Sequence, residues 1–524
     1  MKKYVSCLGL VLLALSLAAQ EEISPPAEPP AALQPPDRED RPSLSSIDEQ
    51  RRQVIRYGTD SEIANLIKTL RSEEAGENDS LDGELLALAQ KTKNHLILSG
   101  IFSFFGDREK RGLEERALEA LGNRDYETAE TVNAAIDYLG KVRAPEAREP
   151  FQDILNGEEN RFLPAAIRSL GRCAGEDAGE TAEYLVDYYT NRDVGDENRR
   201  LIITALGDTG ARECAAFLVS LAENDDERAP LRMSALEALA KIAAPEGLPA
   251  LIKASSSRDP NVRSTAIASL GPFSGGEADA AIIEAFRDSY YRTRIAAAKA
   301  AGERKLQAAV PYLRFRSEND DVPAVRDEAI KAMGAIGGGD AEKILEGLFK
   351  ERKNSDRIRI NAAEMLLAGA SGGYTQAVIA ELDEAKAKNQ TALYNGFLRI
   401  LGGAKSEDLN GLARRFFAAG GVVEKSYALD ICLNNDFRDL AGEVRNLTDP
   451  KHGSLSRKSL ILLEKWGLPV TEEPPAAAAT AAEPDAAAPD AAMPNPAGPD
   501  AAAPPEPQEQ QSSEAADSAP AGDP

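Results

Sequence analysis

The sequence predicts an all-α protein: an α-solenoid, or superhelix, of about eleven stacked antiparallel helix pairs of about 32 residues each, flanked by disordered ends. Three observations predict this fold. An eleven-residue pattern recurs at a nearly constant spacing through the middle of the chain, a second apolar segment follows each copy, and the composition changes sharply towards both ends.

Six copies of the pattern align without gaps, and each carries an arginine at its third position. Apolar or small residues mostly fill positions two, six, seven and ten, and these offsets belong to one face of an α-helix. The arginines follow one another at intervals of 31 to 33 residues. The six windows are ENRRLIITALG (197–207), PLRMSALEALA (230–240), NVRSTAIASLG (261–271), RTRIAAAKAAG (292–302), AVRDEAIKAMG (324–334) and RIRINAAEMLL (357–367).

Weaker copies extend the repeat in both directions. Upstream copies end at Gly106, Gly140 and Gly171, and downstream copies end at Gly402, Leu433 and Gly467. A short turn and a second apolar segment, such as CAAFLVSLA or ADAAIIEAF, follow most windows. The repeating unit is therefore two helices, and we expect the solenoid to occupy residues 45–467.

The repeating unit resembles the HEAT-like repeat of the phycobilin-lyase type. In that family a helix opens with Val-Arg, continues Ala-x-x-Ala-Leu-Gly, and leads through a turn to a helix with an early proline. The window NVRSTAIASLG matches the first part, and Pro249 and Pro311 lie where the family places its proline. The resemblance covers roughly residues 47–467 and implies a stacked solenoid, without implying a particular partner.

The N-terminus is typical of a secretory signal peptide, predicted here over residues 1–19. Lys2 and Lys3 form a basic region, a short apolar run follows, and small residues precede Gln20. We therefore expect an exported protein, periplasmic or secreted, with no stable membrane span after cleavage. An uncleaved anchor and lipidation at Cys7 are the alternatives.

Two further segments have compositions typical of disorder. Residues 20–44 form a Pro-rich linker, and residues 468–524 form an Ala/Pro-rich acidic tail. The tail contains no Lys or Arg from residue 471 onwards. It is predicted to be a spacer or solubility device, with docking to a basic partner as the alternative.

The cysteines that follow the signal peptide predict no disulfide framework. Cys173, Cys214 and Cys432 are odd in number and widely spaced. Cys214 and Cys432 lie in apolar helical contexts, so we expect small buried core residues, with a Cys173–Cys214 bridge as the alternative.

Catalytic chemistry finds little support in this sequence. Only two histidines are present, His95 and His452, and neither is followed by glutamate. The His-Glu iron site of deoxyhypusine hydroxylase, which has a similar architecture, is therefore absent. No nucleophile elbow, phosphate loop or C-x-x-C motif occurs. We expect no enzyme activity, no cofactor and no metal, and the net charge of −25 argues against nucleic acid.

The recurring arginines are interpreted as a structural ladder. A residue at one position of every repeat forms a column in a stacked solenoid, and Asp259, Asp321 and Asp356 lie near helix starts, where they can cap helices and pair with arginines. An anion-binding column is the alternative. The ladder residues are Arg199, Arg232, Arg263, Arg294, Arg326 and Arg359.

One basic segment stands out from the acidic background. Residues 287–316 hold eight basic residues against two acids, with Tyr290, Tyr291, Tyr312 and Phe315 interleaved. We expect the arginine-bearing helices to line the concave groove, so this segment is a candidate site for an acidic peptide or other anionic partner. The alternative is a surface that offsets neighbouring acids. The candidate partner-binding residues are Tyr291, Arg292, Lys299, Arg304 and Lys305.

These features favour an exported, non-enzymatic scaffold or adaptor that binds a protein or peptide, possibly an acidic one, in its solenoid groove. The alternatives are an accessory subunit of an envelope enzyme, a lyase-like HEAT repeat protein, and a binder of an anionic ligand through residues 287–316. The sequence does not indicate an oligomeric state.

Overall fold

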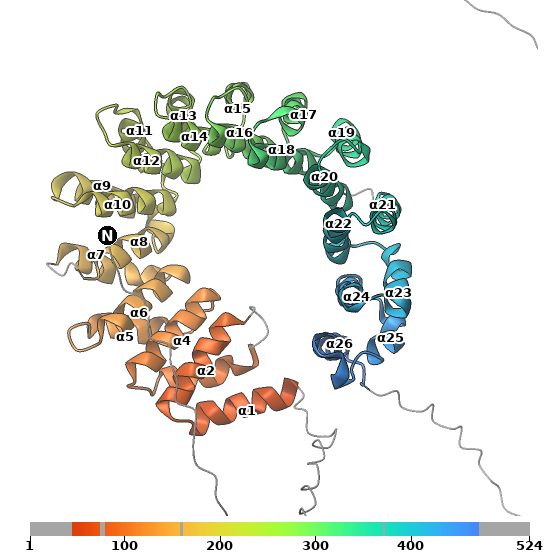
Figure 1. Ribbon diagram of the computed structural model, residues 1–524. Coiled ribbons are helices and arrows are strands. Elements are labelled where there is room, and N and C mark those ends of the chain that lie inside the picture. Colours follow the sequence, from red (N-terminus) through yellow and green to blue (C-terminus); the bar gives the residue numbers. More distant parts are fainter. Residues whose placement is uncertain (1–43, 74–78, 158–160, 370–372, 471–524) are drawn as a thin grey trace, which may run out of the picture.

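The described residues form two concentric layers of helices (Figure 1). The computed structural model describes residues 44–73, 79–157, 161–369 and 373–470. The predicted signal peptide lies outside these ranges, as do almost all of the Pro-rich linker and the acidic tail.

Twenty-six α-helices alternate between the layers, and the described residues contain no strand. Odd-numbered helices form the outer layer and even-numbered helices the inner layer (Figure 1). The outer helices are α1 (Leu44–Tyr57), α3 (Asp82–Ala89), α5 (Glu114–Gly122), α7 (Arg148–Asn156), α9 (Ala178–Asn191), α11 (Ala215–Glu223), α13 (Leu248–Ala254), α15 (Gly276–Ala285), α17 (Val310–Asn319), α19 (Gly339–Lys350), α21 (Thr375–Ala387), α23 (Leu409–Ala419) and α25 (Ala441–Arg445). The inner helices are α2 (Asp60–Ser72), α4 (His95–Asp107), α6 (Ala129–Lys141), α8 (Leu163–Arg172), α10 (Asp196–Thr209), α12 (Ala229–Ile242), α14 (Pro260–Ala268), α16 (Tyr291–Glu303), α18 (Pro323–Ile336), α20 (Asp356–Ala368), α22 (Thr391–Gly403), α24 (Val422–Asn435) and α26 (Ser454–Lys465).

The all-α solenoid predicted from the sequence is confirmed, with thirteen outer–inner pairs in the described residues instead of about eleven. The first pair, α1 and α2, accounts for part of the difference, because α2 carries neither the arginine nor the terminal glycine of the repeat pattern. Each arginine-bearing window forms an inner helix, so these helices line the concave side, as expected (Figure 1).

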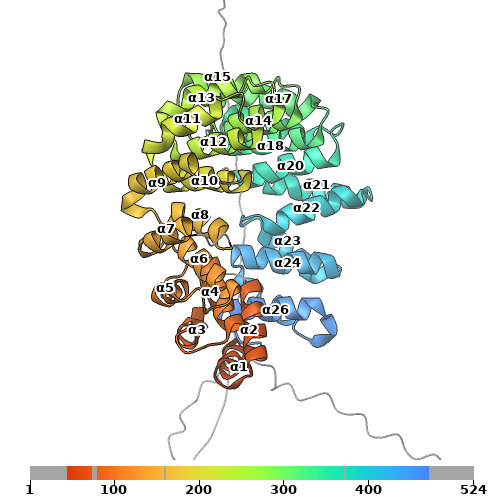
Figure 2. The same cartoon turned by 90° about the vertical axis from the view of Figure 1, so that its left-hand side faces the viewer.

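The stack curves strongly, so that α1 and α26 come back towards one another across an opening (Figures 1 and 2). Glycines and alanines at the contacts between neighbouring inner helices allow their close approach. A Cβ at Gly171 would lie 2.3 Å from the carbonyl oxygen of Ala205, and one at Gly207 would lie 2.9 Å from Cα of Ala238. Only glycine permits such spacing, which helps to keep the inner layer shorter than the outer one.

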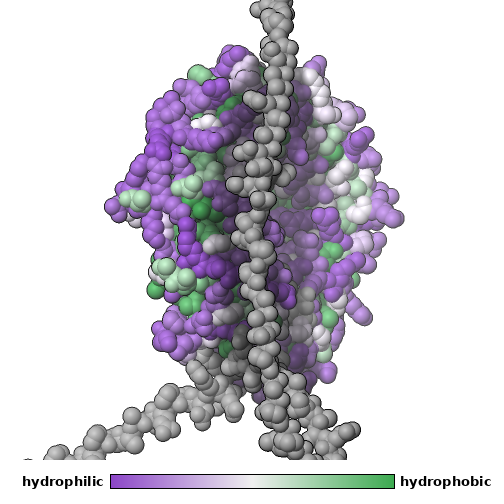
Figure 3. All heavy atoms as spheres, turned by 90° about the vertical axis from the view of Figure 1, so that its right-hand side faces the viewer, coloured by the Kyte–Doolittle hydropathy of each residue, from purple (hydrophilic) through white to green (hydrophobic). Residues whose placement is uncertain are grey.

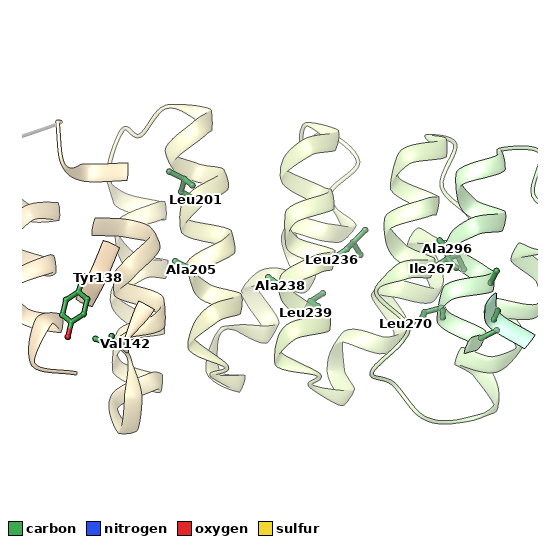
Figure 4. Close-up of a cluster of buried hydrophobic side chains, with 14 of the residues drawn as sticks. Tyr138, Val142, Leu201, Ala205, Leu236, Ala238, Leu239, Ile267, Leu270 and Ala296 are labelled. Atoms are coloured by element: carbon green, nitrogen blue, oxygen red, sulfur yellow. The ribbon is translucent and has the colours of Figure 1, made fainter. Parts of the chain in front are cut away.

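The hydrophobic core runs without interruption through the stack. Figure 4 shows buried side chains on inner helices along the stack, from Tyr138 on α6, through Leu201 on α10 and Leu236 on α12, to Ile267 on α14 and Ala296 on α16. Each repeat thus buries its apolar face against its neighbours, which is the physical basis of a solenoid. The face of the molecule seen in Figure 3 is mostly hydrophilic where it is not covered by grey atoms, with hydrophobic residues interspersed among the polar ones.

The three cysteines of the solenoid are free and buried, so Cys173 and Cys214 form no bridge. Burial raises the pKa of the Cys173 thiol to about 12 and that of Cys214 to about 11, and such thiols are unreactive near neutral pH. Within the described ranges, every helix is too short or too polar to cross a membrane.

Candidate functional site on the concave surface

Three of the five predicted partner-binding residues, Tyr291, Arg292 and Lys299, are exposed on α16. Alanines and glycine fill the buried faces of this helix, including Ala297, Ala298 and Ala301. Arg292 and Lys299 are exposed, seven residues and so about two turns apart. Because the outer helix and the neighbouring inner helices cover the other faces, these two side chains face the hollow of the solenoid.

Lys299 belongs to a column of side chains on the inner helices. It occupies the eighth position of its eleven-residue window, and residues at this position on neighbouring helices reach one another. Opposite charges pair in the column at two places, one on each side of α16 and neither next to it. These pairs are Asp137–Arg168, at 4.0 Å, between α6 and α8, and Glu364–Arg399, at 3.2 Å, between α20 and α22.

At α16 and α18 the column instead places two lysines side by side. Lys331 on α18 occupies the position equivalent to Lys299, and both are exposed. Neither ammonium has a hydrogen bond or ion pair to any residue that the structure describes. On one side the column continues with Ala268, which is apolar, and on the other with Glu364, which already binds Arg399.

Few acids on these two helices oppose the lysines. Asp327 is engaged by Arg357 and Asn361 on α20, which leaves Glu303 and Glu328. The centre of the concave surface therefore holds two adjacent lysines that form no ion pair with the described residues, within a protein of net charge −25. Such a pair favours an acidic ligand, because two adjacent ammonium groups repel each other unless an anion lies between them.

The structure does not bring the five predicted residues into one cluster. Tyr291 and Arg292 lie together at the start of α16, where the guanidinium Nε of Arg292 donates to the Tyr291 hydroxyl at 3.2 Å. Arg304 is not accessible to a partner, because it pairs with Asp279 on α15 and its side chain is largely buried. Lys305 is exposed in the turn after α16, about 20 Å from Tyr291 along the helix.

The basic segment 287–316 is also divided between the two layers. Arg287 follows α15, and Arg314 and Arg316 lie on α17, all in the outer layer. Arg314 pairs with Glu318 at 3.1 Å, and Arg316 contacts Asp320 at 3.3 Å. Residues close in sequence are therefore separated here, because the chain crosses from one layer to the other twice within thirty residues.

The arginine ladder is most complete at α14 and α16. Arg263 donates to both carboxylate oxygens of Asp288, at 2.7 and 3.0 Å, and Arg294 donates to those of Asp320, at 2.7 and 2.8 Å. Each guanidinium also donates to a carbonyl oxygen just before its own helix, that of Ser257 or of Asp288. Each of these two arginines thus links two repeats. It contacts the turn between the outer and inner helix of its own repeat and the acid in the same turn of the next repeat.

The other four ladder arginines differ from this pattern. Arg232 donates to the Ala222 carbonyl oxygen and pairs with Asp225, and Arg359 donates to the Phe349 carbonyl oxygen and pairs with Glu381. Arg199 lies over the Tyr189 ring at 5.4 Å, and its Nε is buried without a hydrogen bond. The side chain of Arg326 has no polar partner among the described residues, so internal pairing does not extend to it.

The acids named for the ladder also act differently from one another. Asp259 caps α14 by accepting from the Asn261 backbone N–H, and Asp321 contacts Arg294 at 3.1 Å. Asp356 begins α20 without pairing to Arg359. The main partners, Asp288 and Asp320, lie 25 and 26 residues after their arginines.

Sequence reasoning missed Lys331, which completes the basic pair. A signal was available, because Lys299 and Lys331 occupy the same window position 32 residues apart. Within the described ranges, no group of His, Cys, Asp and Glu side chains is arranged to hold a metal ion.

The fold and its repeat define an α-solenoid of HEAT repeats. The chain belongs to the family of spirochaete HEAT repeat proteins, whose family model matches residues 55–461. The HEAT-repeat identity expected from the sequence is therefore confirmed. A comparison with curated proteins gives no match.

Solved structures with a similar chain path include the karyopherin Kap121p. Kap121p alone is 11% identical, with a TM-score of 0.40, over 80% of this chain and 53% of that chain. Kap121p bound to Pho4p is 11% identical, with a TM-score of 0.37, over 81% of this chain and 54% of that chain. The chain thus spans about half the length of these structures.

Proposed function

We propose that this protein is an exported, non-enzymatic scaffold whose concave surface at α16 and α18 binds an acidic segment of a partner protein. The observation that carries the proposal is that Lys299 and Lys331 lie side by side without an ion-pair partner, in a column that pairs opposite charges at two other places. Arg292 and Tyr291 extend the same surface towards the start of α16.

The curvature of the solenoid supports a macromolecular partner. A concave surface lined by thirteen inner helices offers an extended binding face, as solenoids generally do. Exposed charges at its centre contribute specificity and association rate more than stability. A lysine pair inside the curve therefore favours an acidic segment over a neutral or basic one.

Site-specific photo-crosslinking tests the proposal. A photo-reactive amino acid in place of Ala268 sits on the exposed face of α14, next to Lys299 in the column. We expect a discrete protein adduct in cells, lost in the double variant Lys299→Glu/Lys331→Glu. The matched control is Lys343→Glu/Lys353→Glu, which makes the same charge change at exposed residues of α19 and the loop after it.

Three outcomes separate the candidate functions. An adduct that survives the lysine double variant contradicts the basic-pair site. Capture of a polysaccharide or small anion instead of a protein favours the anionic-ligand alternative. An adduct with an enzyme, accompanied by altered activity of that enzyme, favours the accessory-subunit alternative.

The exported location is part of the same proposal, and it rests on residues 1–19. Deleting them should keep the protein in the cytoplasm. N-terminal sequencing of the extracytoplasmic form should find a chain that begins near Gln20. An extracytoplasmic form that retains Met1 contradicts cleavage.

A further inference from the structure

The outer layer holds an aromatic and basic groove, which we call the α15–α17 groove. Its cavity of about 280 Å³ is lined by Phe286, Arg287, Pro311, Tyr312, Phe315 and Arg316. The rings of Phe286 and Tyr312 stack with centroids 6.0 Å apart. Phe315 is 56% exposed, which is unusual for a large apolar side chain.

Two guanidinium groups lie against the rings of Tyr312, which is half-buried, and Phe315, which is exposed. Arg287 lies over Tyr312 at 5.6 Å, and Arg316 lies over Phe315 at 5.4 Å. Arg287 also pairs with Glu284, but both side chains are more than half exposed, so this ion pair is weak. The groove thus combines flat apolar walls with cations at its edge.

An equivalent groove elsewhere in the outer layer has the opposite charge. Between α9 and α11, a cavity of about 340 Å³ is lined by Glu183, Asp187 and Glu213, together with Val186 and Phe217. Gaps between outer helices are therefore a general feature of the solenoid. The α15–α17 groove differs from the α9–α11 groove in combining several aromatic rings with guanidinium groups.

Aromatic grooves of this kind suit proline-rich segments. Prolines spaced three apart present a flat apolar edge in the polyproline II helix, which is already extended and loses little entropy on docking. Acidic residues beside the prolines add attraction to arginines at the edge of the groove.

The chain carries such a segment after its last helix. Residues 471–524 contain twelve prolines and eleven acids, with no Lys or Arg. Residues 494–507, PNPAGPDAAAPPEP, place prolines three apart twice, at Pro496 and Pro499 and at Pro504 and Pro507. Asp500 and Glu506 lie beside them.

The segment is long enough to reach the groove of its own chain. Four repeats separate α26 from α17 and α18, which is about 40 Å along the stack at 8–10 Å per helix. The 23 residues between Val470 and Pro494 make 24 steps, so they would reach about 75 Å if extended at the rise of polyproline II. We propose that residues 494–507 dock in the α15–α17 groove of the same chain.

Crosslinking within the full-length protein tests this docking. A diazirine analogue of methionine at Met493 lies directly before the segment. Full-length chains that carry it are mixed with an excess of ¹⁵N-labelled chains that lack it, and the adducts are mapped by mass spectrometry. We expect adducts within one chain, concentrated on residues 286–287 and 310–316.

Variants of the groove and of the proline-rich segment test whether the adduct depends on each of them. Phe315→Ala and Arg287→Glu should each lower the yield of this adduct about five- to tenfold, the loss expected when an anchor of a small interface is removed. Replacing Pro504, Pro505 and Pro507 by alanine should have a similar effect. Tyr126→Ala, at an exposed aromatic residue far from the groove, should leave the yield unchanged.

Three results would overturn the proposal. One is a set of adducts spread over the whole surface, and another is a yield that Phe315→Ala does not change while the thermal midpoint is preserved. The third is a set of adducts that join ¹⁵N-labelled and unlabelled chains, which would place the segment on a second copy. None of these results depends on the partner of the concave surface.

Discussion

The ion pair between Arg294 and Asp320 is the most thoroughly buried of the ladder. Their side chains are 7% and 0% exposed, and two hydrogen bonds join them. Burial raises the pKa of the Asp320 carboxyl, but hydrogen bonds from Arg294 and from the Val322 backbone N–H outweigh it, and the net pKa is lowered. The carboxylate is therefore ionised at neutral pH and holds Arg294 in place.

Removing one member of this pair should destabilise the protein strongly. Asp320→Ala leaves the Arg294 guanidinium buried with reduced compensation, which costs about 3–5 kcal/mol. Asp321→Ala is the matched control, because that side chain is 87% exposed and its loss should cost less than about 1 kcal/mol. Urea denaturation followed by circular dichroism measures both. Equal midpoints for the two variants would mean that the buried pair is not a structural anchor.

Glu424 gives the protein a defined sensitivity to acid. Its carboxylate accepts hydrogen bonds from the Lys386 ammonium, the Tyr394 hydroxyl and the Gly421 backbone N–H. The hydrogen bonds from Lys386 and Tyr394 are the main cause that lowers its pKa to about 2. Because the pKa is lower in the folded state than in the unfolded chain, this stabilisation is complete above about pH 4.5.

Stability should therefore fall as the pH decreases from about 4.5 towards 2. Glu424→Gln removes the charge, so the variant should be less stable than the wild type by about 1–2 kcal/mol at pH 7, after allowance for solvent screening. The difference between the two proteins should shrink towards pH 2. Thermal midpoints over this range measure it, and a constant difference would contradict the assigned pKa.

At the scale of helices, the glycine that ends most inner windows sets how closely the inner helices pack. Gly171 and Gly207 each contact the residue two positions before the end of the next inner window, Ala205 and Ala238. A Cβ at Gly171 would overlap the Ala205 carbonyl oxygen. The glycine is thus required by packing, although it lowers the helix propensity of the sequence.

Alanine substitutions should have opposite effects at two helical glycines. Gly171→Ala should destabilise the protein by about 1–3 kcal/mol, because backbone must move to accept the methyl group. Gly347→Ala, on the outer helix α19, should stabilise it by about 0.5–1 kcal/mol, because nothing lies within 4 Å of its Cβ and alanine is the better helix former. Differential scanning calorimetry compares the midpoints. A stabilised Gly171→Ala variant would show that the helices separate freely.

The helices could be predicted well from the sequence because their pattern is local. The side-chain ion pairs could not be predicted where they depend on residues of the next repeat. Arg294 is paired because Asp320 lies three residues before the next inner helix, whereas the residue at the same position for Arg326 is Lys353, a base. The split of residues 287–316 between two layers is likewise invisible in their composition. Window position, which places Lys299 beside Lys331, predicts the concave surface better than proximity along the chain.

At the scale of the whole molecule, curvature follows from the difference in spacing between the two layers. Inner helices approach through glycine and alanine, and outer helices are separated by grooves such as those at α9–α11 and α15–α17. The stack therefore bends towards its inner side, and α1 and α26 come near each other (Figure 1). The shape of the concave surface is in this way encoded by small residues far from its exposed charges.

Increasing the distance between neighbouring inner helices should therefore reduce the curvature of the solenoid. Leucine at Gly207 and Gly302 would push α10 from α12 and α16 from α18, because their Cβ positions lie 2.9 and 3.2 Å from the Cα atoms of Ala238 and Ala332. The outer spacing is unchanged, so the bend per repeat decreases and the ends move apart. Small-angle X-ray scattering should show a larger radius of gyration and maximum dimension. Leucine at Gly347 and Gly411, on outer helices with open space around them, is the matched control and should leave both dimensions unchanged. An unchanged curve in the Gly207/Gly302 variant, with helicity preserved, would mean that the loops rather than the glycines set the bend.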